Sequence, residues 1–293
     1  MPALQAYTSQ PAVLAVTDED AAAYLQSQFS NDLRRSEANP VTYGLFLDRK
    51  GKVLHDAFIL QRAPEDFLLV SYHSDAEALQ RKVEENIIAD EVEIENVSAQ
   101  YRLVTLFGSE GLSDITPPEK CFAERDGVLV FSGRLAGAGS LDCLVPSDAE
   151  WPPSFINTVP ADSSAALAAR IASGIPAIPQ DIGESDLPHE GGDLSTAAVS
   201  YTKGCYLGQE VMARLHAMGR AQRAIYRVNF ASQSNDGSPL PVFSGERQIG
   251  AVTSHRDGAG LALLKRRYVA NDAQLCIAKP GGPALEIFSE ITA

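Results

Sequence analysis

One cysteine stands among residues that favour a reactive thiol. Cys205 lies two positions after Lys203, and Gly204 and Gly208 allow the nearby backbone to turn sharply or to approach a ligand closely. Gln209 begins a helix-forming stretch, which places Cys205 just before the N-terminus of a helix. A neighbouring ammonium group and a helix dipole both stabilise a thiolate and lower the pKa of a cysteine. The pattern indicates a reactive thiol, and a buried, inert cysteine is the alternative.

Basic residues gather around this cysteine although the chain as a whole is acidic. Its 293 residues include 24 Lys and Arg against 38 Asp and Glu, a net charge of −14. From Lys203 to Arg227 there are five basic residues and one acidic residue, a local charge of +4. This contrast predicts a site for an anionic ligand, with a solvated basic face as the alternative. The overall negative charge opposes phosphate backbones and anionic lipids, so we expect no direct binding of nucleic acid and no membrane association.

Several other classes of site lack their signatures. The sequence contains no phosphate-binding glycine-rich loop, no zinc-protease histidine pair and no serine-hydrolase elbow. No two of its four cysteines lie within four residues of each other, so we expect no metal site. No apolar run reaches the ~18 residues typical of a transmembrane helix. The N-terminus carries no Lys or Arg before Arg34, unlike a signal or transit peptide, so we expect a cytoplasmic protein.

The hydrophobic pattern predicts a mixture of helices and hairpins before residue 174. Capping-box patterns at Thr17 and Ser74 predict the starts of two helices, and Gly174 predicts the end of a third. The expected helices cover residues 21–29, 74–88 and 163–172. The expected strands cover residues 13–16, 41–47, 53–60, 67–72, 92–97, 101–107, 128–131 and 141–145.

The pattern changes in the last third of the chain. Residues 174–198 are rich in Gly, Pro, Asp and Ser and predict a long loop, which at this length is usually functional. Short strands are then expected over 224–230, 248–254, 260–264 and 274–278, which is typical of a small β-barrel. We therefore expect an α+β fold, with a larger portion of two sub-domains over 1–221 and a barrel over 222–293.

The segment around the cysteine also carries a family resemblance. Residues 203–210 read Lys-Gly-Cys-Tyr-Leu-Gly-Gln-Glu and resemble the signature of the folate-binding iron–sulfur cluster assembly and repair family. That family is related to the T-protein of the glycine cleavage system, an aminomethyltransferase. Residues 26–32, 170–176, 187–190 and 249–254 resemble further stretches of the family, so the resemblance covers nearly the whole chain.

The resemblance implies a fold and a ligand. It implies ferredoxin-like units around a central channel that holds tetrahydrofolate, with the pterin inside and the glutamyl tail pointing outward, and a C-terminal β-barrel. Asn31, Asp32 and Asp56 are candidates for the pterin end, and Arg214 and Arg220 for the tail. The implied catalytic residues are Cys205, Lys203 and Asp56, and the implied cofactor-binding residues are Asn31, Asp32, Tyr206, Gln209, Glu210, Arg214 and Arg220.

Two departures distinguish the chain from the aminomethyltransferase pattern. The T-protein uses a catalytic Asp in a Gly-Gly-x-x-Asp-Asp hairpin, whereas residues 51–56 read Gly-Lys-Val-Leu-His-Asp and keep only the final Asp56 of the pair. A Glu-Ala-Gly stretch of the T-protein corresponds to Ala-Ser-Gly at 172–174. These changes favour a tetrahydrofolate-binding protein that supports iron–sulfur enzymes or assembly proteins. A folate-dependent aminomethyltransferase or demethylase and a non-folate interaction protein are the alternatives.

Overall fold

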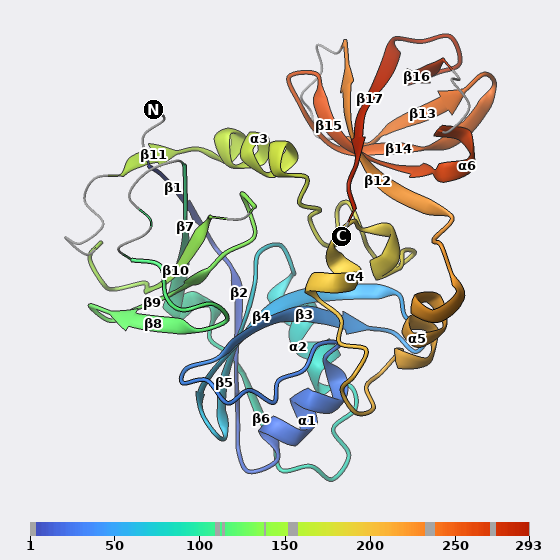
Figure 1. Cartoon of the computed structure of the whole chain (residues 1–293). Helices are drawn as coiled ribbons and strands as arrows, with labels where there is room; N and C mark the ends of the chain where they lie inside the picture. Colours follow the sequence, from blue (N-terminus) through green and yellow to red (C-terminus); the bar gives the residue numbers. More distant parts are fainter. Residues whose placement is uncertain are drawn as a thin grey trace.

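Two antiparallel-rich sheets and a closed barrel form the framework of the chain (Figure 1). The computed structural model describes residues 4–108, 112, 115–137, 139–151, 158–231, 238–269 and 274–292. Within these ranges, no helix is long and apolar enough to cross a membrane. The expected combination of an α+β portion with a C-terminal barrel is confirmed.

The first sheet has five antiparallel strands in the order β3-β4-β5-β2-β6. Its strands are β2 (Ala12–Thr17), β3 (Val41–Leu47), β4 (Val53–Ala63), β5 (Asp66–Ser71) and β6 (Glu93–Asn96). Alternate residues of a strand point to opposite faces. Leu14 therefore packs with Leu25 and Leu79 of the helices α1 (Ala21–Gln28) and α2 (Ala76–Glu84), while Val13 packs on the other face.

The second sheet covers that other face. Its order is β11-β1-β7-β10-β9-β8, and only the β1–β11 pair is parallel among the described strands. The strands are β1 (Gln5–Ser9), β7 (Tyr101–Phe107), β8 (Phe122–Arg125), β9 (Val128–Ser132), β10 (Leu141–Pro146) and β11 (Val159–Ala161). Phe58 of the first sheet packs with Phe131 and Leu144 of the second, so an apolar layer joins the two sheets.

A short helical region connects these sheets to the barrel. It contains α3 (Ser163–Ser173), η3 (Pro188–Glu190), α4 (Leu194–Ala197) and α5 (Gln209–Met218). The six-stranded barrel consists of β12 (Arg223–Phe230), β13 (Leu240–Ser244), β14 (Arg247–Arg256), β15 (Ala259–Lys265), β16 (Leu275–Ile277) and β17 (Ala284–Glu290). The turn-like α6 (Arg266–Val269) follows β15, and η1 (Ser98–Gln100) precedes β7.

A buried ion pair ties α3 to the barrel. Arg170 donates to Asp181 at 2.5 Å and to the Ser254 hydroxyl of β14 at 2.6 Å. Asp181 also accepts a hydrogen bond from Thr253 at 2.5 Å. Gly174 ends α3 with φ of 72°, a left-handed conformation that glycine adopts without strain. These contacts fix the end of α3, the loop after it and one barrel strand together.

The sequence analysis misplaced two helix caps and missed several strands. Asp20, not Thr17, occupies the N-cap of α1 and makes no side-chain cap, and Asp75 rather than Ser74 caps α2 by accepting from the Ala78 amide. The loop predicted over 174–198 contains η3 and α4. Five strands have no counterpart in the prediction: β1, β8, β11, β13 and β17.

Candidate functional site

The signature segment 203–210 is fastened to the end of α1. The Ser200 amide donates to the Ser30 carbonyl at 3.0 Å, and the Leu207 amide donates to the Ser27 carbonyl at 3.3 Å. The two stretches that resemble the family at 26–32 and 203–210 are therefore in direct contact, although about 170 residues of chain separate them. The loop that carries Cys205 is held by backbone contacts at both ends.

Lys203 is the main tie between the two stretches. Its ammonium group donates to the carbonyls of Gln26, Phe29 and Asn31 at 2.6, 2.6 and 2.9 Å. Helix C-termini leave carbonyls without intrahelical partners, and a cation there is favourable. Burial lowers the pKa of Lys203 to about 8. The structure thus directs the ammonium group into the end of α1, whereas the sequence suggested that it acts on Cys205.

Cys205 is exposed, in contrast to the other three cysteines, which are buried. It lies four residues before the first residue of α5, as the sequence suggested. Gly208 has φ of 84°, and a Cβ there would lie 2.7 Å from the Asp48 carbonyl oxygen. This glycine lets the start of α5 pack directly against the β3–β4 turn. The exposed thiol therefore lies on a loop that packs against the β3–β4 turn.

The other signature residues line a small hollow beside the loop. Tyr206 is buried, and its amide donates to the Gln209 side chain at 3.1 Å. The hollow has a volume of about 200 Å³ and is lined by Ser200, Tyr201, Lys203, Tyr206, Gln209, Glu210 and Ala213. The predicted binding residues Tyr206, Gln209 and Glu210 are thus brought together, next to Lys203.

Asp56 lies inside the molecule and not on its surface. Its carboxylate accepts hydrogen bonds from the Tyr43 hydroxyl at 2.8 Å and the Ser71 hydroxyl at 3.2 Å. Burial raises the pKa of Asp56, and the bond from Tyr43 and the charge of Arg134 oppose that shift. Asp56 is only 5% exposed, so its carboxylate does not face the solvent.

A second cavity lies where the two sheets meet, with a volume of about 230 Å³. Its aromatic walls are Tyr43 and Phe58, and its polar groups include Asn31, Arg35 and Arg134. The remaining lining residues are Val41, Thr42, Glu119, Lys120, Ser132, Gly133 and Ala197. Within the described chain, the buried Nε of Arg35 has no hydrogen-bond partner. A buried donor left in this state favours a polar ligand group at that point.

Arg134 is held in place over this cavity. Its guanidinium donates to both carboxylate oxygens of Asp193 at 2.8 and 3.0 Å and lies 4.4 Å from the centre of the Tyr43 ring. Bidentate pairing and stacking on an aromatic ring together fix the orientation of a guanidinium. Sequence reasoning missed Tyr43, Arg134 and Asp193, because nothing in their local pattern distinguishes them from ordinary strand and turn residues.

A second buried acid lies behind the same cavity. Asp142 accepts hydrogen bonds from Thr105 at 2.6 Å and from Tyr72. Burial raises the pKa of Asp142 to about 6. The Arg134 amide donates to the Tyr72 hydroxyl at 2.8 Å, so this acid is linked to the cavity wall. The sequence analysis did not select Asp142, which reads as one polar position within a strand.

The remaining predicted residues divide between the cavity and the surface. Asn31 lines the cavity and donates to the carbonyls of Tyr43 and Ala197 at 2.8 and 3.1 Å. Asp32 forms a bidentate pair with Arg34, which holds the pKa of Asp32 well below its usual range. Arg214 and Arg220 are exposed on or after α5, and neither lines the cavity that Asn31 lines.

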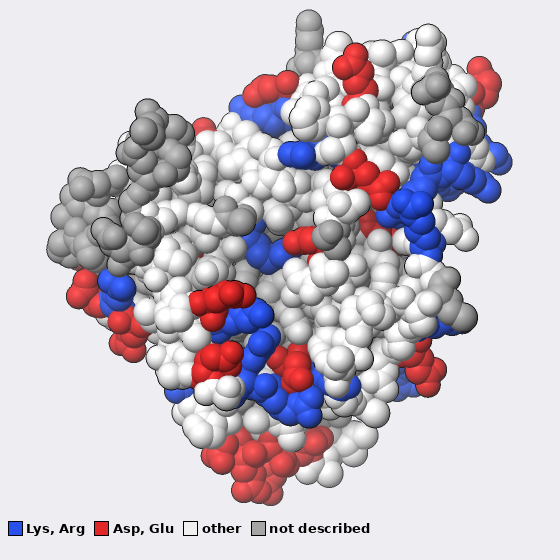
Figure 2. Space-filling view, viewed as in Figure 1, with Lys and Arg blue, Asp and Glu red and all other residues white. Residues whose placement is uncertain are grey.

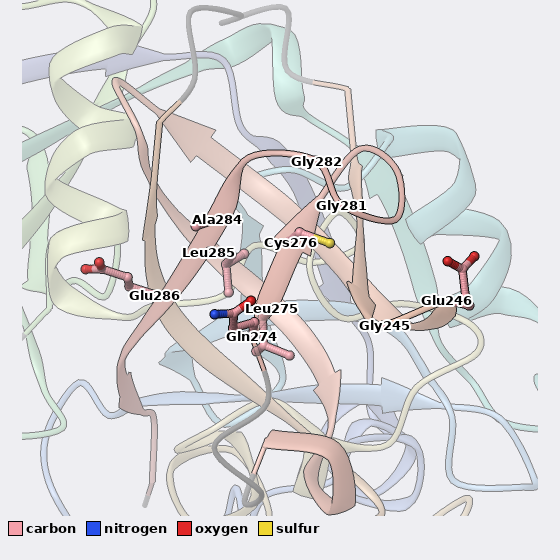
Figure 3. A pocket seen from close by; sticks show the side chains of 10 residues that line it. All are labelled: Gly245, Glu246, Gln274, Leu275, Cys276, Gly281, Gly282, Ala284, Leu285 and Glu286. Atoms are coloured by element: carbon pink, nitrogen blue, oxygen red, sulfur yellow. The ribbon is translucent and has the colours of Figure 1, made fainter.

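A further hollow lies in the barrel (Figure 3) and has a different character. It measures about 910 Å³ and has Glu246 and Glu286 on opposite sides, with Cys276 between them. None of the described residues in its lining is basic or aromatic, so they do not suit an anionic or ring-shaped ligand. Among the described residues, no group of three or more His, Cys, Asp or Glu could hold a metal ion.

Comparison with known proteins finds similarity to one protein family in the N-terminal part and to several proteins along most of the chain. Residues 9–114, which include the first sheet, Asn31 and Asp56, match the GCVT N-terminal domain family. An aminomethyltransferase of Staphylococcus carnosus is 26% identical over 279 residues, which cover 86% of this chain and 76% of that protein. The chain is thus similar to an aminomethyltransferase over most of its length. The resemblance seen in the sequence is thereby confirmed.

Two other relatives and one solved structure extend the comparison. The tRNA-modifying protein YgfZ of Vibrio vulnificus is 26% identical, covering 87% of this chain and 78% of the relative. A mitochondrial iron–sulfur cluster assembly factor IBA57 homologue of Mycosarcoma maydis is 26% identical, covering 78% and 57%. The aminomethyltransferase T of Bartonella henselae superposes with a TM-score of 0.78 at 16% identity, covering 99% of this chain and 85% of that one. The chain therefore has the fold of this T-protein.

Proposed function

We propose that the chain binds tetrahydrofolate in the cavity between the two sheets and supports the assembly or repair of iron–sulfur proteins. Its similarity to an iron–sulfur cluster assembly factor homologue and to YgfZ supports the second part. The buried, unpartnered Nε of Arg35 in an aromatic-walled cavity carries the first part. The folate-binding portion is proposed to span residues 1–221 and the barrel 222–293.

The residues of the cavity fit a bicyclic ring with polar edges. Tyr43 and Phe58 offer apolar surface, and Asn31, Arg35 and Arg134 offer polar groups beside it. A volume of about 230 Å³ is below the roughly 300–1,000 Å³ of sites that enclose a whole drug-sized ligand. The cavity therefore suits the ring of a folate, with the tail outside it. A bound reduced folate supplies nitrogen atoms that carry one-carbon units.

Asp56 acts on this cavity through Tyr43. Its carboxylate accepts from the Tyr43 hydroxyl, and the Tyr43 ring forms part of the cavity wall. Asp56 is not among the residues that line the cavity, so we assign it a positioning role. The hydrogen bond fixes the Tyr43 ring between Phe58 at 5.0 Å and the Arg134 guanidinium at 4.4 Å.

Calorimetric titration with tetrahydrofolate under reducing, anaerobic conditions tests the ligand. We expect saturable one-to-one binding, weakened at least tenfold by Arg35→Met, since that change removes a donor without a protein partner. Arg125→Met is the matched control, because Arg125 is exposed at the end of β8 and does not line the cavity. No binding by the unaltered chain contradicts the folate proposal, and unchanged binding by Arg35→Met contradicts the assigned cavity.

Cys205 is the proposed reactive thiol of this function. An iron–sulfur cluster usually takes four cysteine ligands, so Cys205 alone does not hold one. We propose that its thiolate acts as a nucleophile, or as a transient ligand while a partner protein supplies the other ligands. The Cys205→Ser variant is expected to fold and to bind tetrahydrofolate. When it is expressed in cells from which the native protein has been deleted, we expect it not to restore the activity of iron–sulfur enzymes. Thr202→Ala, an exposed change in the same loop, is the control. Full support by the serine variant contradicts the role of the thiol.

Aminomethyl transfer to tetrahydrofolate is the second candidate. The 26% identity to an aminomethyltransferase and the buried Asp56 favour it. Consumption of a methylamine-type substrate with formation of a one-carbon folate distinguishes this enzyme from an assembly factor without turnover.

A further inference from the structure

Five basic side chains gather at one end of the barrel. Figure 2 shows Lys and Arg concentrated over α6 and the start of β12, on a molecule whose net charge is −14. We call this group the barrel basic patch; it consists of Arg220, Arg247, Lys265, Arg266 and Arg267. All of them except the half-buried Arg266 are exposed.

Contacts within the barrel place these side chains close together. The Arg266 amide donates to the Gln222 carbonyl at 3.0 Å, which joins α6 to the segment that follows Arg220. Lys265 is paired with Arg223 in the β12–β15 ladder. The positive charge of Arg220 acts to lower the pKa of Tyr226, so Arg220 lies near this residue. The Tyr226 hydroxyl donates to Glu290, and Glu290 forms an ion pair with Arg266. The patch is therefore continuous from the end of α5 to α6.

Two of its arginines are held in position by an aromatic ring. The guanidinium groups of Arg247 and Arg267 lie 5.3 and 4.7 Å from the centre of the Tyr268 ring. Arg247 also donates to the Tyr268 hydroxyl. Neither arginine forms an ion pair within the described parts of the chain, so both charges remain available to a partner. Ordered side chains lose less conformational entropy on binding than free ones.

The surroundings favour an acidic protein surface over nucleic acid. Arginine and tyrosine are enriched among the residues that dominate protein interfaces. The Tyr268 ring is already engaged by two guanidinium groups, so it does not offer the open face that stacking on a base requires. A local basic patch is enough to steer a protein with clustered carboxylates toward the barrel.

We propose that the barrel basic patch docks an acidic surface of a partner protein. The helix α5 has 10 residues and thus a length of about 15 Å, with Cys205 just before its start and Arg220 just after its end. Arg220, at one end of the patch, therefore lies about one helix length from the signature loop. The docking proposal does not depend on folate binding. Only the idea that the docked partner is served by Cys205 rests on the proposed function.

Fluorescence anisotropy with a labelled decaglutamate peptide tests the patch, with a 20-nucleotide single-stranded RNA as the competing class. We expect the peptide to bind the unaltered chain at 50 mM salt and Arg247→Glu/Arg267→Glu to weaken it at least tenfold. The control Arg49→Glu/Arg125→Glu changes the net charge equally at exposed sites elsewhere and is expected to stay within twofold.

Three results would overturn the proposal: no peptide binding, equal loss in the control pair, or tighter binding of the RNA than of the peptide. Tetrahydrofolate titration of Arg247→Glu/Arg267→Glu is expected to match that of the unaltered chain, because the patch does not line the cavity between the sheets. Failure of the docking proposal and failure of the folate proposal are therefore distinguishable.

Discussion

Arg170→Ala is expected to lower the free energy of unfolding by about 3–5 kcal/mol, the range found when one partner of a buried ion pair is removed. Arg170 and Asp181 are 4% and 2% exposed, so the remaining carboxylate would be left without its counter-charge away from water. The same change removes the bonds to the Ile175 carbonyl and to Ser254 of the barrel. Urea denaturation at pH 7 measures the loss.

A surface ion pair provides the comparison for Arg170. Arg62 and Asp66 are 2.6 Å apart, but both side chains are about one third exposed, and Arg62→Ala is expected to cost less than about 1 kcal/mol. Arg170→Lys keeps the charge but loses the forked geometry, so its cost is expected to fall between the two. Equal costs for Arg170→Ala and Arg62→Ala would show that the buried pair does not tie α3 to the barrel.

Much of the fold could be predicted from local patterns. The β3–β4 hairpin, the end of α3 at Gly174 and the β-rich C-terminus each have a signal within a few residues. Two of the missed strands, β8 with four residues and β11 with three, lie at the edges of the second sheet, where alternation is too brief to detect. The α1 cap was misplaced because Thr17 is the last residue of β2 and is therefore engaged in the sheet.

The candidate site was only half predictable. Cys205 and Gly208 could be selected because their chemistry and conformation belong to single residues. Arg134 could not be selected, because its role depends on stacking on Tyr43 and on pairing with Asp193. These three residues are far apart in the sequence. Arg220 is a candidate for the folate tail in the sequence, and in the structure it also lies near Tyr226 of the barrel. Charge predicts an anion and does not predict which one.

The contact of Lys203 with the end of α1 predicts the second large effect on stability. Lys203→Met is expected to lower the free energy of unfolding by about 2–3 kcal/mol, since a single charged donor satisfies three carbonyls at 2.6–2.9 Å. Methionine keeps the length and apolar stem of the side chain and removes only the ammonium group, so lost packing does not account for the change. Urea denaturation at pH 7 measures it.

Lys50→Met is the matched control, because Lys50 is exposed in the β3–β4 turn and forms no ion pair among the described residues. We expect it to change the stability by less than about 0.5 kcal/mol, as for ordinary surface substitutions. Equal stability of the Lys203→Met and Lys50→Met variants would mean that the three carbonyls are satisfied by water instead. A selective loss would show that this lysine holds the cysteine loop against α1.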